Sequence, residues 1–159
     1  FYKSVAQLPD FEDYSMKGRT YRYFEGEAQF PFGYGLSYTT FKYGSPELSS
    51  MEVAADGSAT LSVKVSNTGN YDGEEVVQLY LQKPDDADGP TKALRGFERV
   101  FVPKGETVEL RFALSAEVLE WWNPEIERMT PLAGDYRLLV GSSSRNEDLQ
   151  TVDFKVLVD

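Results

Sequence analysis

The stretch "TLSVKVSNTGNYDGEEVVQLYLQ", residues 60–82, decides the fold class of this chain. Its first part alternates apolar and polar residues, which is typical of a strand with one buried face. Its last part has apolar residues on both faces, which indicates a more central strand. The inward residues of the two parts are Leu61, Val63, Val65, Val77, Leu79 and Leu81, and Val76 and Tyr80 lie on the opposite face of the second. The Asn- and Gly-rich link 67–73 predicts that the two strands form a hairpin with a long connection.

Five further stretches outside this pair have the length and composition of strands. They are residues 48–53, 93–102, 107–114, 135–141 and 151–158. The apolar residues expected to face inward in the last three are Val108, Leu110, Phe112, Leu114, Tyr136, Leu138, Val140, Val152, Phe154, Val156 and Val158. Only a short helical turn is expected among them, with Ser115 as its N-cap and Glu117 in its first turn. Seven short strands without a long helix predict an all-β, immunoglobulin-like, seven-stranded sandwich. The lack of cysteine favours the fibronectin type III variety.

Residues 1–37 differ from the rest of the chain, and we interpret them as an irregular arm attached to a sandwich of residues 38–159. Ten of the 22 aromatic residues fall in the arm without a regular period: Phe1, Tyr2, Phe11, Tyr14, Tyr21, Tyr23, Phe24, Phe30, Phe32 and Tyr34. A segment this apolar should be covered on more than one side. In "FPFGYGLSYTTF", residues 30–41, one proline and two glycines allow the aromatic rings to be aimed irregularly. We therefore predict a joint between domains, with Tyr23, Phe30, Phe32 and Tyr34 as contacts and Phe41 as the first core residue.

Composition excludes several classes of function. The 26 acidic and 16 basic residues give a net charge of −10, which disfavours nucleic acid and anionic membranes as partners. No run approaches the about 18 apolar residues of a membrane helix. Histidine and cysteine are absent, so His-based triads, Cys nucleophiles, the usual zinc sites and disulfides are excluded. We predict no metal and no cofactor.

The acidic residues contain no convincing catalytic or calcium-binding motif. Glu74 and Glu75 are adjacent on a strand and must face opposite sides, so they cannot form the carboxylate pair of a glycosidase. "DDADG", residues 85–89, resembles the start of a calcium loop, but Phe97 stands where an EF-hand has its bidentate glutamate. We interpret this segment as a turn, and "GSSSR", residues 141–145, as the connection between the last two strands.

Trp121 and Trp122 are candidates for stacking on a sugar ring. Because they are sequential on an extended segment, at most one can form such a platform while the other enters the core. Core packing is the expected role of a tryptophan in a sandwich.

Several motifs together resemble one family. "KGRTYRYFEGEAQFPFGYGLSYTTF" at 17–41, "NTGNYDGEEVVQLYLQ" at 67–82, "LRGFERVFVPKGETVEL" at 94–110 and "GDYRLLVGSSSR" at 134–145 resemble the C-terminal region of glycoside hydrolase family 3, the β-glucosidases and β-xylosidases. The resemblance implies a fibronectin type III-like domain preceded by the tail of an α/β catalytic domain. It also implies that the catalytic residues lie upstream, so this chain, which starts at Phe1 as a piece of a larger protein, has none.

The resemblance is compatible with three roles for this domain. The domain would brace the upstream catalytic domains of the same polypeptide, which the aromatic arm favours, or it would bind oligosaccharide or polysaccharide, or act as a protein-interaction module. A homodimer through the arm is a further implied arrangement. The candidate sugar-binding residues are Trp121, Trp122 and, at the rim of the parent's active site, Arg19 and Tyr21. The parent would be an extracellular or periplasmic enzyme that cleaves terminal β-linked glucose or xylose with retention of configuration.

Overall fold

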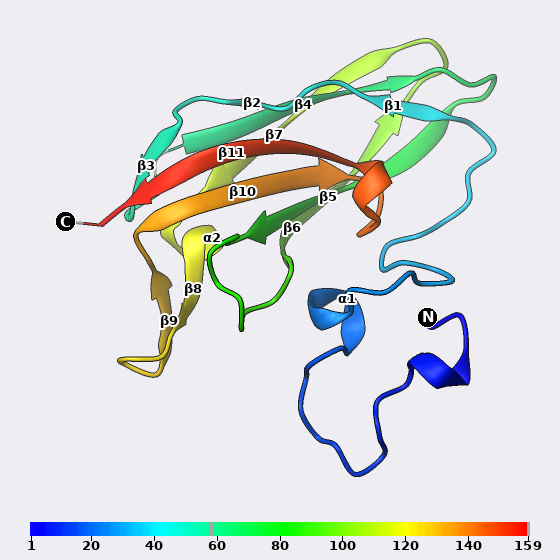
Figure 1. The fold of residues 1–159 in the computed structure, drawn as a ribbon. Coiled ribbons are helices and arrows are strands. Elements are labelled where there is room, and N and C mark those ends of the chain that lie inside the picture. The colour runs from blue at the N-terminus through cyan, green and yellow to red at the C-terminus, as the bar shows by residue number, and fades with distance from the viewer. Residues whose placement is uncertain (58, 159) are drawn as a thin grey trace.

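The computed structural model describes residues 1–57 and 59–158, and it is a sandwich of two β-sheets with an arm beside it (Figure 1). In the smaller sheet β4 (Ala59–Asn67) is central, with β7 (Thr107–Leu114) on one edge and β1 (Phe41–Tyr43) and β2 (Glu47–Leu48) on the other. The larger sheet has the order β3 (Glu52–Ala54), β11 (Leu149–Leu157), β10 (Gly134–Gly141), β5 (Gly73–Gln82) and β6 (Ala93–Val102). The all-β sandwich predicted from the sequence is confirmed.

The core lies between the two sheets and is built from the alternating residues of their inner faces. Its largest fully buried members are Trp121, Tyr136, Leu61, Leu79, Leu81, Leu114, Leu119 and Leu138. Phe41 packs against this core from β1, as predicted. The expected inward position of Val158 is wrong, because Val158 lies past the end of β11 and is 47% exposed.

The predicted hairpin between residues 60–67 and 74–82 is also wrong, since β4 and β5 lie in different sheets. Both edges of β4 are already paired, so no edge remains for β5. The buried side chain of Asn67 holds the crossing between the sheets: its Nδ2 donates to the carbonyls of Tyr71, at 2.8 Å, and of Val102, at 2.9 Å. Alternation along a strand shows which side chains face inward, but it carries no information about the neighbouring strand.

The strand predicted at 48–53 is split between the two sheets. Its first part, β2, pairs with β4, and its second part, β3, runs parallel to β11 in the larger sheet. Between them the Ser49 amide donates to the Thr60 carbonyl at 3.0 Å, and the Met51 carbonyl accepts from Lys155 at 2.9 Å. The chain therefore changes sheet within three residues, because its two ends find partners on opposite layers.

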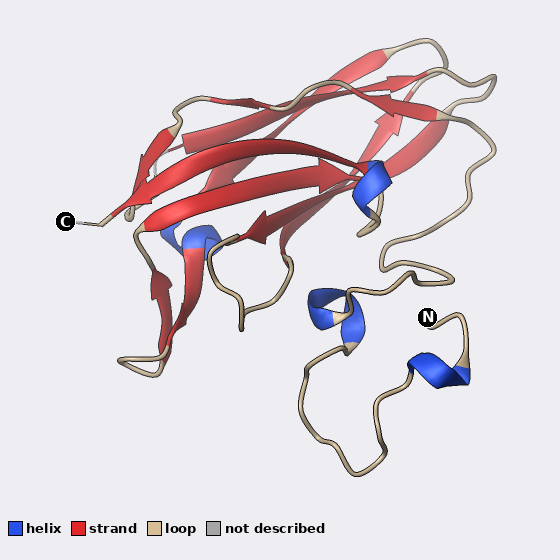
Figure 2. Ribbon diagram, in the orientation of Figure 1, coloured by secondary structure: helices blue, strands red, loops and turns tan. Residues whose placement is uncertain are grey.

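After β7 the chain forms one helical turn and a hairpin that the sequence did not predict. The turn, α2 (Ala116–Leu119), is capped by Ser115, whose Oγ accepts from the Val118 amide at 3.4 Å, as expected. The hairpin joins β8 (Glu120–Asn123) to β9 (Arg128–Pro131) and extends away from the sandwich (Figure 2). Its turn is supported by Asn123, whose Oδ1 accepts from the Glu125 amide at 2.9 Å.

The arm is irregular, as predicted. It contains only the short helices η1 (Val5–Gln7) and α1 (Thr20–Tyr23) and an isolated bridge between Tyr2 and Ala28. The predicted boundary at residues 37 and 38 falls in the linker before β1, and the predicted end of the domain at Asp159 lies outside the described residues. Figure 1 shows the arm, which includes α1, beside the larger sheet and near η2 (Asn146–Asp148), the turn between β10 and β11.

Candidate interdomain surface

Tyr21 fixes the arm to the outer face of the larger sheet. Its ring stacks on Phe32 at 4.6 Å between centroids and meets the fully buried ring of Tyr80, on β5, edge to face at 5.8 Å. Its hydroxyl oxygen accepts from the Leu94 amide at 3.1 Å. Tyr21, predicted at the rim of a sugar site, is therefore occupied in holding arm and sandwich together.

Gly33 lies where the arm comes close to β5. Its φ is +81°, a conformation that favours glycine, and a Cβ at this position would come within 2.3 Å of the Gln78 side-chain amide. Gln78 is only 4% exposed, its Nε2 donates to the Ser142 carbonyl at 2.5 Å and its Oε1 accepts from the Tyr80 hydroxyl at 2.5 Å. The glycine thus lets the arm lie directly on a fixed polar group of the sheet.

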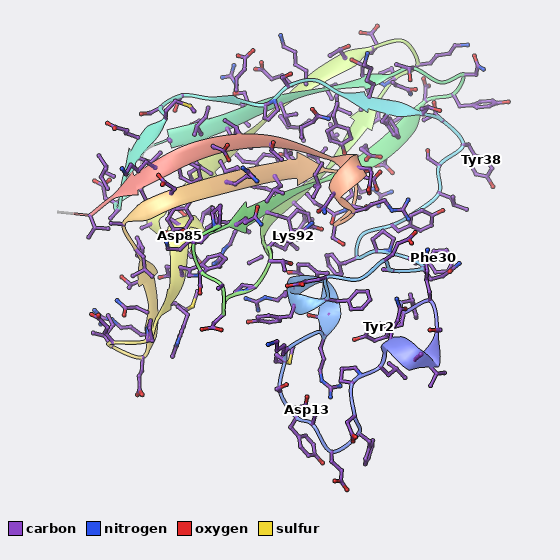
Figure 3. The ribbon with its side chains drawn as sticks, viewed as in Figure 1. Tyr2, Asp13, Phe30, Tyr38, Asp85 and Lys92 are labelled. Atoms are coloured by element: carbon purple, nitrogen blue, oxygen red, sulfur yellow. The ribbon has the colours of Figure 1, made fainter. Side chains whose placement is uncertain are left out.

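Two loops of the sandwich complete the region that holds the arm. We call this region the seat; it comprises Tyr21 and Gly33 of the arm and Gln78, Thr91 and Lys92 of the sandwich. The Arg22 carbonyl accepts from the amide and the hydroxyl of Thr91, at 2.6 and 3.0 Å. The neighbouring Lys92 is buried, and its Nζ donates to the Ser144 carbonyl at 2.8 Å and to Asn146 Oδ1 at 2.6 Å. Burial lowers the pKa of Lys92. Figure 3 labels Lys92 between the sandwich and α1, where it ties the β5–β6 loop to the β10–β11 loop.

Large apolar side chains are exposed along the arm and its linker to β1, and we call them together the aromatic surface. Its members are Phe1, Phe11, Tyr14, Phe30, Phe32, Tyr34, Leu36 and Tyr38, all between 42% and 97% exposed. Phe30 contacts both Phe1 and Tyr34, with centroids 6.3 and 5.4 Å apart, so part of the group is preassembled. Tyr23, also predicted as a contact, is half-buried. Single exposed apolar residues are ordinary, but exposed rings in mutual contact, as Phe1, Phe30 and Tyr34 are, mark an interaction surface.

Between the arm and the sandwich lies a cavity of about 1400 Å³. Aromatic residues of the arm line one side of it, and the β10–β11 loop lines the other with charged residues that include Arg145 and Glu147. Pockets for small ligands usually measure roughly 300–1,000 Å³. The cavity is larger than this range, which suits a protein segment better than a single small ligand.

The four candidate sugar-binding residues are not brought together. Arg19 and Tyr21 lie in the arm, while Trp121 and Trp122 lie on β8, at a separate place in the molecule (Figure 1). The guanidinium of Arg19 turns back onto its own loop, where it donates to the carbonyls of Ser15, Asp10 and Asp13.

Of the two tryptophans, Trp121 is buried and Trp122 is exposed, in line with the expectation that at most one can form a platform. Trp121 is 2% exposed, and its Nε1 donates to Asp86 Oδ2 at 2.5 Å. Asp86 also accepts from the Gly89 amide at 3.0 Å. This aspartate of segment 85–89 therefore stabilises both the turn and the buried Trp121 ring. Trp122 is 51% exposed on the hairpin and is the one of the pair able to act as a platform.

The paired glutamates face opposite ways. Glu74 forms an ion pair with Arg99 on the outer face of the larger sheet, while Glu75 accepts from the Tyr43 hydroxyl at 2.7 Å. Burial raises the pKa of Glu75, against the lowering effect of this hydrogen bond. A group of three or more His, Cys, Asp or Glu residues that could hold a metal ion is not found within residues 1–57 and 59–158.

Sequence reasoning missed three residues of the seat, namely Gln78, Thr91 and Lys92. Gln78 offered a signal, because it is the one polar residue in the otherwise apolar run 76–81 and a polar residue there must find a buried partner. Thr91 and Lys92 stand in a polar loop and offered none.

Residues 75–144 match the model of the "Fibronectin type III-like domain" family. This region is a fibronectin type III-like domain. The chain is 50% identical over 151 residues to a xylan 1,4-beta-xylosidase of Xylanibacter ruminicola, which covers 94% of the chain and 17% of that enzyme. It is 37% identical over 158 residues to a periplasmic beta-glucosidase of Salmonella typhimurium, covering 91% of the chain and 20% of the enzyme.

A solved structure of a β-glucosidase also resembles this chain. The GH3 beta-glucosidase of Bifidobacterium adolescentis superposes with a TM-score of 0.75 at 30% identity, over 86% of this chain and 20% of that one. The chain thus spans about a fifth of the length of these relatives. The resemblance to glycoside hydrolase family 3 drawn from the sequence motifs is confirmed.

Proposed function

We propose that this fibronectin type III-like domain is a non-catalytic brace within a β-glycosidase, a β-glucosidase or β-xylosidase of glycoside hydrolase family 3. The observation that carries the proposal is the arm, which Tyr21 and Gly33 fix to the sandwich while its aromatic surface stays exposed. A segment held in this way presents a preformed apolar surface to a neighbour. The neighbour is the catalytic part of the same polypeptide, since the relatives are about five times as long as the matching region.

The chemistry of the parent lies outside this chain in the proposal. A retaining β-glycosidase needs two carboxyl groups roughly 5–5.5 Å apart. The two adjacent glutamates face opposite sides of a sheet, and Glu75 accepts a hydrogen bond from Tyr43. We expect no turnover of aryl β-glucosides or β-xylosides by the 159-residue chain above a carrier-protein control; measurable turnover that follows the purified chain would contradict the non-catalytic role.

Carbohydrate binding is a second candidate function, which the exposed ring of Trp122 favours. Titration of the chain with xylan, cellulose and laminarin tests it. Saturable binding that is lost in Trp122→Ala, while the variant stays folded, would establish a carbohydrate module. The brace alone predicts no saturable binding.

The proposal places the parent outside the cytoplasm, in the periplasm or the extracellular space. The Salmonella relative is named as periplasmic, which supports this placement. Within the described part of the chain, none of the helices has the length and apolar character needed to cross a membrane. Fractionation of the source cells, with activity and immunodetection of the domain in each fraction, tests the placement.

A further inference from the structure

The outer face of β5 and β6 exposes a second apolar patch. Phe97 is 69% exposed, Phe101 is 55% exposed and Val76 is 41% exposed. Alternation along β6 directs Val100 and Val102 into the core, so Phe97 and Phe101 point outward. Outward positions of a solvent-facing sheet are normally polar, which makes two phenylalanines on one face of an edge strand unusual.

This patch continues directly from the seat of the arm. Phe97 is the register partner of Gln78, the residue on which Gly33 lies. Further along the same face, Val76 is opposite Arg99, and Glu74 is opposite Phe101. The arm covers one part of the outer face of β5 and leaves the adjoining part bare.

The linker from the arm to β1 passes the inner side of the larger sheet at the start of β5. A Cβ at Gly73, the first residue of β5, would contact Thr39, Phe41 and Ser37, so the linker passes the start of β5 on its way to the smaller sheet. Two linker residues, Leu36 and Tyr38, are 90% and 97% exposed. The bare patch therefore adjoins the arm where Gly33 lies on Gln78, the register partner of Phe97.

We propose that Val76, Phe97 and Phe101 form a docking surface for the polypeptide that precedes Phe1 in the parent enzyme. The inference rests on the proposed function and names the face of the sandwich that the brace uses. Phe1 lies on the arm, where its amino group donates to the Phe30 carbonyl at 2.8 Å, so a polypeptide joined to Phe1 would start from the arm. The relatives are about five times as long as the match, which supplies ample chain to cover the face.

The chemistry of the patch fits a protein segment. Arg99, which pairs with Glu74, lies between the two aromatic rings along β6, so the patch combines apolar area with one exposed ion pair, as protein interfaces do. A sugar would need several polar groups aimed at its hydroxyls, and the patch offers only this ion pair. A second copy of the chain would bring another net charge of −10 against the first.

The test compares the parent enzyme with the 159-residue chain by hydroxyl-radical footprinting. Oxidation of Phe97 and Phe101 should fall at least threefold in the parent, because the preceding polypeptide covers both rings. Equal oxidation in the two proteins would overturn the inference. A fall in oxidation in the 159-residue chain as its concentration rises would overturn it in favour of a second copy.

Variants of the parent separate this inference from the proposed function. Phe97→Ser with Phe101→Ser should increase the rate of proteolytic cleavage between the domain and the rest of the enzyme several-fold. The control pair Ile126→Ser with Met129→Ser, also exposed but on the β8–β9 hairpin, should leave that rate unchanged. If only Phe30→Ser with Tyr34→Ser loosens the parent, the brace stands and the docking surface is wrong; if neither pair does, both proposals fail.

Discussion

At Gly33 the arm lies directly on the sandwich, against the side chain of Gln78. Gly33→Ala places a methyl group against the Gln78 amide at a positive φ, so the arm must lift from β5. We expect a loss of about 1–3 kcal/mol in the free energy that holds the arm on the sheet. Hydrogen exchange of the amides of residues 20–34 measures it.

Gly35 provides the matched control for this substitution. It lies two residues away, and a Cβ there would meet nothing within 4 Å. Gly35→Ala should therefore leave exchange in the arm almost unchanged. Equal effects of the two substitutions would show that Gly33 has no special part in seating the arm.

Glu75 gives the domain a pH dependence of predictable sign. Burial raises its pKa in the folded protein above the ordinary value of 4.5, so the folded state retains the proton to higher pH than the unfolded chain. The contribution of Glu75 to stability is then complete below its unfolded pKa and is lost as the pH rises through its folded pKa. Glu75→Gln removes this loss while its Oε1 can still accept from Tyr43.

Chemical denaturation of the wild type and Glu75→Gln at pH 4 and pH 7 measures the effect. The free energy of unfolding of Glu75→Gln should gain on the wild type as the pH rises. Exposed carboxylates with lowered pKa, such as Asp153 beside Arg137, act with the opposite sign but are shared by both proteins and cancel in the difference. A difference independent of pH would contradict the raised pKa.

At the scale of elements, the two tryptophans of β8 should differ sharply. Trp121→Ala empties a core position and removes the hydrogen bond to Asp86, and we expect it to cost about 3–5 kcal/mol of unfolding free energy. Trp122→Ala removes a half-exposed ring, and we expect it to cost less than about 1 kcal/mol. Urea denaturation followed by tyrosine fluorescence or circular dichroism compares them, and similar costs would contradict the placement of β8.

The strands show how far sequence reasoning reaches for this fold. Alternation located β4, β7 and β10 and most of their inward residues, because burial of one face is a local property of a strand. It did not predict strand pairing, because pairing depends on which strand edges are free. β4 had no free edge for β5, and the stretch 48–53 divided between two sheets. The β8–β9 hairpin was missed because its strands are only four residues long.

At the scale of the whole molecule, the sequence predicted the arm and its aromatic excess but not how the arm is held. An aromatic residue on an irregular segment can face the sandwich or a partner, and only the spatial contacts separate Tyr21, which packs on Tyr80, from Phe30, which remains half-exposed. The seat also depends on Gln78 and Lys92, which donate hydrogen bonds to carbonyls more than fifty residues away in the chain. Contacts at such separation leave no local pattern.

Hydrogen exchange of residues 1–18, measured in the 159-residue chain as a monomer and in the parent enzyme, tests the brace most directly. These residues precede the seat and include the exposed Phe1, Phe11 and Tyr14. The account predicts fast exchange in the isolated chain and strong protection in the parent, where the catalytic part covers the arm. Strong protection already present in the monomer, or fast exchange in both proteins, would contradict it.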